Sequence, residues 1–81
     1  MTHRDTIAAR LRELRRLKAA KDDRYISQGE VAEAIGVSNA SISNWETGTC
    51  AIDLEDAWKL ADYYGVAIGE LAGRAEHEPA I

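Results

Sequence analysis

The stretch that decides the fold is Ser27-Gln-Gly-Glu-Val-Ala-Glu-Ala-Ile-Gly-Val-Ser-Asn-Ala-Ser-Ile-Ser-Asn-Trp-Glu-Thr-Gly48. It opens with a capping box, in which the Ser27 hydroxyl accepts from the backbone N–H of Glu30 and the Glu30 side chain reaches back to the N–H of Ser27. Apolar side chains then recur four apart, and Gly36 supplies the left-handed residue that ends a helix. The pattern predicts a short helix that ends at a sharp corner.

A second short helix is predicted immediately after this corner. Ser38 is a good N-cap, and Ile42 and Trp45 lie three apart on the buried face until Gly48 stops the run. Ala32 in the first helix is small enough to let another helix approach closely. Two short helices joined by so tight a turn form a helix-turn-helix, a device that reads DNA.

The outward face of the second helix, residues 38–47, is small, polar and uncharged. At about 100° per residue, the side chains that point away from the buried side are Ala40, Ser43, Asn44 and Thr47, with Asn39 and Ser41 on the flanks. Amides can pair with adenine, hydroxyls can donate or accept, and a methyl group can touch thymine. A solvated helix would show the same composition, so the inference depends on the two-helix context. Without Arg or Lys on this face, we expect half-sites with important A·T pairs rather than guanine contacts.

These residues resemble the Cro and phage-repressor type of helix-turn-helix regulator, the Xre family. The resemblance is carried by Ile26-Ser27-Gln28 with Val31-Ala32, by Gly36-Val37-Ser38, and by Ile42-Ser43-Asn44-Trp45-Glu46-Thr47-Gly48. It implies an all-α, compact four- to five-helix lambda-repressor-like DNA-binding domain, with the motif at helices 2 and 3. The implied function is sequence-specific binding of a double-stranded DNA operator as a transcriptional regulator, most often a repressor.

The resemblance and the direction of the side chains together assign roles to individual positions. The candidates for base edges are Asn39, Ala40, Ser43 and Asn44. The candidates for phosphate are Ser27, Gln28, Ser41, Thr47, Thr49, Lys21 and Arg24. The candidates for support of the recognition helix are Arg15, Glu46, Trp45, Ala32, Gly36 and Ile42. Arg15 stands where the family tends to pair an arginine with the glutamate that matches Glu46.

The segment 19–25 departs from the family pattern, which usually reaches the motif within a few residues. The first helix, expected over about residues 5–20, is therefore longer, or its loop is expanded. Lys21 and Arg24 could use this extension to reach the DNA backbone. A solvated loop in which the neighbouring aspartates cancel these charges is an equally good alternative.

Downstream, Asp53 is expected to cap a fourth helix that Gly65 closes. The apolar face expected for this helix comprises Leu54, Ala57, Trp58, Leu60, Ala61 and Tyr64. A short fifth element with Ile68 and Leu71 either completes the core or, by analogy with the family, forms the surface of a homodimer. The domain is assigned to residues 1–73, and the polar tail 74–81 is expected to be disordered.

The net charge of −4 hides a strong asymmetry. Residues 1–24 carry eight basic groups against four acidic ones, whereas residues 25–81 carry two against ten. Such a molecule would present its basic end to phosphate and its acidic end to solvent or to a partner. The acidic part therefore supports a second hypothesis, a protein-interaction module such as an antitoxin or anti-regulator.

Other classes of function find little support. No apolar run approaches the length of a membrane span and the N-terminus is too polar for a signal peptide, so a cytoplasmic location in a bacterial cell or phage-infected host is expected. The single Cys50, expected to be half-buried between helices, cannot form an internal disulfide. With His3 and His77 near the termini, no metal site is expected. Nor is there a catalytic motif, so we expect neither an enzyme nor a cofactor.

Overall fold

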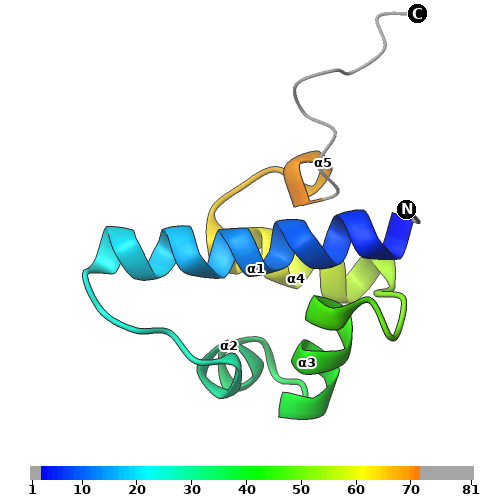
Figure 1. Ribbon diagram of the computed structural model, residues 1–81, viewed down its shortest axis with the longest axis horizontal. Coiled ribbons are helices and arrows are strands. Elements are labelled where there is room, and N and C mark those ends of the chain that lie inside the picture. Colours follow the sequence, from blue (N-terminus) through cyan, green and yellow to red (C-terminus); the bar gives the residue numbers. More distant parts are fainter. Residues whose placement is uncertain (1–2, 72–81) are drawn as a thin grey trace, which may run out of the picture.

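Five helices make up residues 3–71, the part of the chain that the computed structural model describes. They are α1 (His3–Asp22), α2 (Gln28–Ile35), α3 (Asn39–Thr47), α4 (Leu54–Tyr64) and α5 (Ile68–Leu71). In Figure 1, α1 lies across the middle of the molecule, with α2 and α3 on one side of it and α5 on the other. The prediction of an all-α domain with the motif at its second and third helices is confirmed. The expected tail 74–81 lies outside the described residues.

The extension at residues 19–25 is mostly helix. α1 continues to Asp22, two residues beyond the predicted end, and the chain then turns through Asp23, whose φ of 56° is left-handed. The turn is closed by the backbone N–H of Arg24, which donates to the Ala19 carbonyl at 3.0 Å. Asp23 thus occupies the position that glycine usually fills at the end of a helix.

The caps of α2 and α3 explain why the corner between them is sharp. The Ser27 hydroxyl accepts from the Glu30 N–H at 3.1 Å, and the Ser38 hydroxyl accepts from the Ser41 N–H at 3.1 Å. Gly36 has a φ of 81°, a left-handed conformation that L side chains rarely adopt. One half of the predicted capping box is wrong, because both oxygens of the Glu30 carboxylate are bound by Arg24 instead of reaching back to Ser27.

The core lies where α1 crosses the other helices. Its most deeply buried side chains are Leu11, Ile26, Val31, Ile42, Leu60 and Leu71. Leu71 is only 2 % exposed and Ile68 packs against the same cluster, so these two residues complete the core. Ile68 is only partly buried, so a dimer role for this element stays a prediction.

Two other expectations about burial are wrong. Leu54 and Trp58 are 69 % and 62 % exposed, although the pattern placed them on the apolar face of α4. The covered stripe of α4 is narrower, with Ala57, Leu60 and Ala61 buried, and Trp58 lies about 100° around the helix from Ala57. Cys50 is exposed, not half-buried. Within the described part of the chain, no helix is both long and apolar enough to cross a membrane.

Candidate nucleic-acid interface

The outward face of α3 is open to solvent. Asn39 and Ala40 are exposed and Ser43 and Asn44 are half-buried, whereas Ile42 turns into the core. Within residues 5–71, no side-chain hydrogen bond holds the amide of Asn39 or of Asn44. Both amides can therefore present their donor and acceptor pairs to an external partner.

Hydroxyl groups on and beside this surface are already engaged with neighbouring groups. Thr47 donates to the Ser43 carbonyl at 3.0 Å, and its oxygen lies 2.8 Å from that of Thr49. Ser41 shares a hydrogen bond with Ser38 at 3.0 Å. Each hydroxyl has one proton and two lone pairs, so Ser41 and Thr47 keep some capacity for a further bond.

The opposite side of α3 is fixed by a buried carboxylate, that of Glu46, which is 2 % exposed. Arg15 donates two hydrogen bonds of 2.8 Å to this carboxylate, from Nε to Oε2 and from Nη2 to Oε1. Gln28 adds a third donor, because its Nε2 lies 3.0 Å from Oε1. The hydrogen bond with Glu46 raises the pKa of the Arg15 guanidinium above its ordinary value, so Arg15 stays charged at any physiological pH.

The Glu46 network joins three helices at one point. Besides holding the carboxylate, Arg15 donates from Nη1 to the Ile26 carbonyl at 2.9 Å, just before α2 begins. Arg12 donates to the backbone carbonyl of Glu46 near the end of α3. Because a bidentate guanidinium–carboxylate pair fixes both distance and angle, the tilt of α3 relative to α1 and α2 is set here.

A model of a helix-turn-helix family matches residues 17–71 of this chain, from the second half of α1 to the end of α5. The chain belongs to the helix-turn-helix family. A phage repressor of Vibrio cholerae, the cryptic phage CTXphi transcriptional repressor RstR, is 38 % identical over 61 residues. That alignment covers 75 % of this chain and 55 % of the relative, so the chain spans about half the length of the protein it matches. No solved structure matches the chain.

The membership confirms the predicted Cro and phage-repressor (Xre) type, with α3 as the recognition helix of the motif. The structure brings the predicted supporting residues together around it. Arg15 and Glu46 form their ion pair, Trp45 and Ile42 are buried beside it, and Ala32 is 3 % exposed at the contact of α2 with α3.

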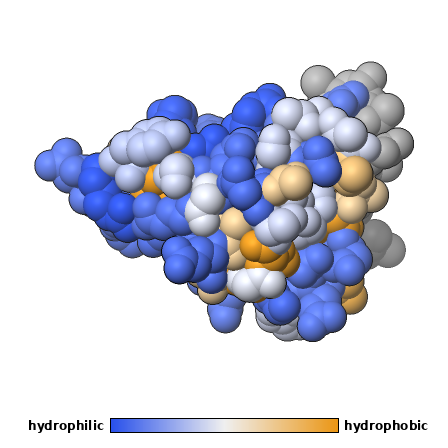
Figure 2. Space-filling view, turned by 90° about the horizontal axis from the view of Figure 1, so that it is seen from below, coloured by the Kyte–Doolittle hydropathy of each residue, from blue (hydrophilic) through white to orange (hydrophobic). Residues whose placement is uncertain are grey.

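The residues predicted to contact phosphate differ in whether their side chains are already paired within the fold. Ser27 and Gln28 stand at the start of α2, where backbone N–H groups favour an anion, although the Gln28 amide nitrogen is used on Glu46. Arg24 is paired with Glu30, and this contact holds the pKa of the Glu30 carboxyl below its ordinary value. Lys21 is exposed in the last turn of α1. Figure 2 shows that the end of the molecule formed by the end of α1 and the following loop is mostly hydrophilic.

Sequence reasoning missed Arg12, which supports the recognition helix through the Glu46 carbonyl. A signal was present, because Arg12 precedes Arg15 by three residues and side chains at that spacing share one face of a helix. The nature of its partner, a backbone carbonyl, could not be read from side-chain types.

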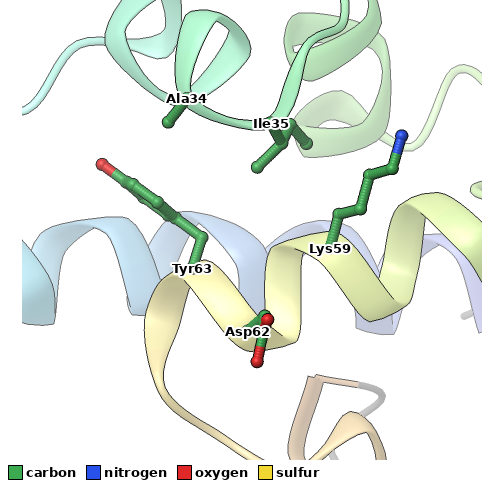
Figure 3. A pocket seen from close by; sticks show the side chains of 5 residues that line it. All are labelled: Ala34, Ile35, Lys59, Asp62 and Tyr63. Carbon is green, nitrogen blue, oxygen red and sulfur yellow. The ribbon is translucent and has the colours of Figure 1, made fainter.

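A groove of about 350 Å³ opens on another side of the motif, between α2 and α4. Figure 3 shows Lys59 and Tyr63 extending from α4 toward Ala34 and Ile35 of α2, whereas Asp62 points away from α2. Ligand sites usually combine an apolar wall with a few converging polar groups. The groove does not show that convergence among the residues that line it, so we assign it no ligand.

Proposed function

We propose that the chain is a sequence-specific, double-stranded DNA-binding transcriptional repressor, of phage or bacterial origin, acting inside the cell with α3 in the major groove. The observation that carries this proposal is the contrast between the two sides of α3. One side is locked by the buried Glu46 network, while the other offers amides and small side chains to solvent. The Vibrio cholerae relative, named as a phage transcriptional repressor, supports the same function.

The base contacts in this proposal come from the exposed side of α3, from Asn39, Ala40, Ser43 and Asn44. An amide held by no other side chain can form the two parallel bonds that asparagine makes with adenine. The face carries no guanidinium or ammonium group, so adenine and thymine are its natural targets. We therefore propose an operator whose half-sites contain important A·T pairs.

Phosphate contacts in this proposal surround the recognition helix. The N-terminus of α2, with Ser27 and Gln28, lies on one side of it, and the hydroxyls of Thr47 and Thr49 lie at its end. Ser41 in the first turn of α3, Lys21 and Arg24 are further candidates. Phosphate contacts position the protein on the duplex and give no sequence preference of their own.

The test of this proposal is selection of bound sequences from a random DNA pool, followed by binding measurements on Asn44→Ala. We expect a selected sequence to bind the variant about 1–3 kcal/mol more weakly, with random DNA affected far less. Ala9→Ser, at an exposed position of α1, serves as a control that leaves both affinities unchanged. Equal affinity of the variant and the parent for the selected sequence would refute the assignment of this face.

A second copy of the chain is the partner that the proposal requires. One small module buries too little surface for tight selective binding, and two modules about 34–36 Å apart read successive major grooves. With Leu71 buried, the exposed apolar ridge Leu54–Trp58 on α4 is the better contact surface.

The ridge is small, which limits the strength of the dimer. Two side chains supply far less than the ~800 Å² per partner that a stable interface buries. We therefore propose a dimer that is weak in solution and is assembled by the operator, which holds both copies at high local concentration. Sedimentation with and without a selected two-half-site operator tests this, and Trp58→Ser should bind the operator without cooperativity while binding a single half-site normally.

The alternative of an antitoxin or anti-regulator that acts through its acidic surface is not favoured, because the relative is itself named as a transcriptional repressor.

A further inference from the structure

A second, smaller cleft lies between α1 and the loop that leads into α2. Its volume is about 190 Å³, and its lining residues are Arg12, Arg15, Arg16, Ala19, Tyr25 and Ile26. Three guanidinium groups thus line one small cleft, in a chain whose net charge is −4. This arrangement is not explained by the Glu46 network alone.

The charges of the cleft are only partly balanced. Arg15 is neutralised by Glu46, and Arg12 donates to a carbonyl, which carries no full charge. Arg16 is 69 % exposed, and its guanidinium lies 3.8 Å from the carboxylate of Glu13, which Arg10 also contacts at 3.1 Å. The cleft therefore keeps excess positive charge and N–H donors that the fold does not use fully.

Tyr25 forms the outer wall of the cleft. It is 78 % exposed, an unusual place for a large aromatic side chain, and it lies on the loop rather than in a helix. Its hydroxyl can donate a hydrogen bond to an anion, and its ring can cover the stem of a neighbouring arginine. A planar guanidinium and a phenol hydroxyl side by side suit the oxygens of a phosphate group.

We propose that this cleft binds a phosphate group, with Arg16 and Tyr25 as the principal donors and Arg12 in support. The source that the geometry favours is the backbone of the bound DNA, so this part of the inference rests on the proposed function. Tyr25 stands three residues before Gln28, which corresponds to a span of at most about 10 Å. One strand carries a phosphate every ~3.4 Å of helix axis, so the strand that crosses the start of α2 reaches the cleft as well.

The experiment compares Arg16→Ala and Tyr25→Phe with Lys59→Ala. Lys59 is a matched control, because it too is an exposed cation in a long ion pair, at 4.0 Å from Glu55. Affinities for a selected sequence and for random DNA are measured from 50 to 200 mM salt. Arg16→Ala should make the negative slope of log affinity against log salt shallower by about 0.9. The ratio of parent affinity to variant affinity should therefore fall about 3.5-fold between 50 and 200 mM salt. Lys59→Ala should leave the slope unchanged.

Sequence preference provides a second readout. Because a phosphate contact carries no base information, Arg16→Ala should weaken binding to the selected sequence and to random DNA by the same factor. Tyr25→Phe removes only one hydroxyl and should weaken both without changing the salt slope. A loss confined to the selected sequence would overturn the proposal.

Free phosphate is the other possible source, and a separate arm identifies it. Inorganic phosphate replaces chloride at constant ionic strength while the thermal unfolding of the DNA-free protein is followed. A rise in Tm for the parent and Lys59→Ala but not for Arg16→Ala, with no change in the DNA salt slope, assigns the cleft to a free phosphate ligand. If neither the slope nor the Tm distinguishes Arg16→Ala from Lys59→Ala, the proposal is wrong. If the parent selects no DNA sequence, the proposed function fails, but the arm with free phosphate still tests the cleft.

Discussion

The substitution Glu46→Gln tests the centre of the molecule most directly. Glutamine has nearly the same shape as glutamate, so no cavity forms, but one carboxylate oxygen becomes an NH₂ group. The two bonds from Arg15 and the one from Gln28 all need an acceptor, and the variant places a donor against donors. The change therefore removes at least one strong bond and leaves the Arg15 charge without its partner.

The expected magnitude follows from the burial of the pair. Breaking a buried ion pair from one side costs about 3–5 kcal/mol. The Glu46 side chain is 2 % exposed, but that of Arg15 is 20 % exposed and can recover some water. We therefore expect a loss at the lower end, about 3 kcal/mol. For a small domain with an m-value of about 1.5 kcal/mol/M, the midpoint of urea unfolding should fall by about 2 M.

The assay is urea unfolding at neutral pH, with Glu13→Gln as the matched control. Glu13 is 47 % exposed and contacts Arg10 and Arg16 at the surface, so the same substitution should cost there at most about 1 kcal/mol. A double variant, Arg15→Met with Glu46→Leu, should recover part of the loss, because an apolar pair of similar volume has no unpaired charge. A loss below about 1 kcal/mol for Glu46→Gln would refute the reasoning.

Three further predictions concern the ends of the helices and one partly buried phenol. Asp23→Gly should raise the free energy of unfolding by about 0.5–1 kcal/mol, because glycine adopts the left-handed φ of 56° without strain and a negative charge leaves the end of α1; an unchanged urea midpoint contradicts this. Gly36→Ala should lower the free energy of unfolding by about 1 kcal/mol through backbone strain alone, since a Cβ there would meet nothing within 4 Å. A much larger loss would mean that the added methyl group clashes with a neighbour. Burial raises the pKa of Tyr64 above its ordinary value, so the stability that this phenol contributes is complete below about pH 10 and is lost as the pH rises toward the folded-state pKa. Tyr64→Phe should therefore flatten the alkaline decline in Tm, and an identical decline in the variant would exclude this source.

The local signals of the motif were readable from sequence because they act over three or four residues. Ser27 and Ser38 cap the helices they were expected to cap, and Gly36 ends the first of them with the expected left-handed φ. Such caps depend on one side chain and the backbone beside it. The choice of Arg24 as partner for Glu30 was not readable, because it depends on how the preceding loop folds back.

The faces of α4 show where periodicity stops being informative. The spacing identified an apolar helix, yet Leu54 and Trp58 are exposed because no other described helix covers that flank. The position of an apolar side chain in a sequence pattern does not reveal whether it is buried by residues of the same chain or by a partner. The same reasoning applies to Ile68 and Leu71, for which the sequence left both a core role and a dimer role open.

The two sides of α3 differ in what they contribute to the fold, which has a consequence for how such a protein can diverge. The side chains that fix the tilt of the helix face one way, and the amides of Asn39 and Asn44 contribute no side-chain bond to the fold within residues 5–71. Substituting other residues for Asn39 and Asn44 should therefore change the preferred operator with little loss in the free energy of unfolding. Substitutions on this one exposed surface would then change what the protein recognises while the scaffold stays the same.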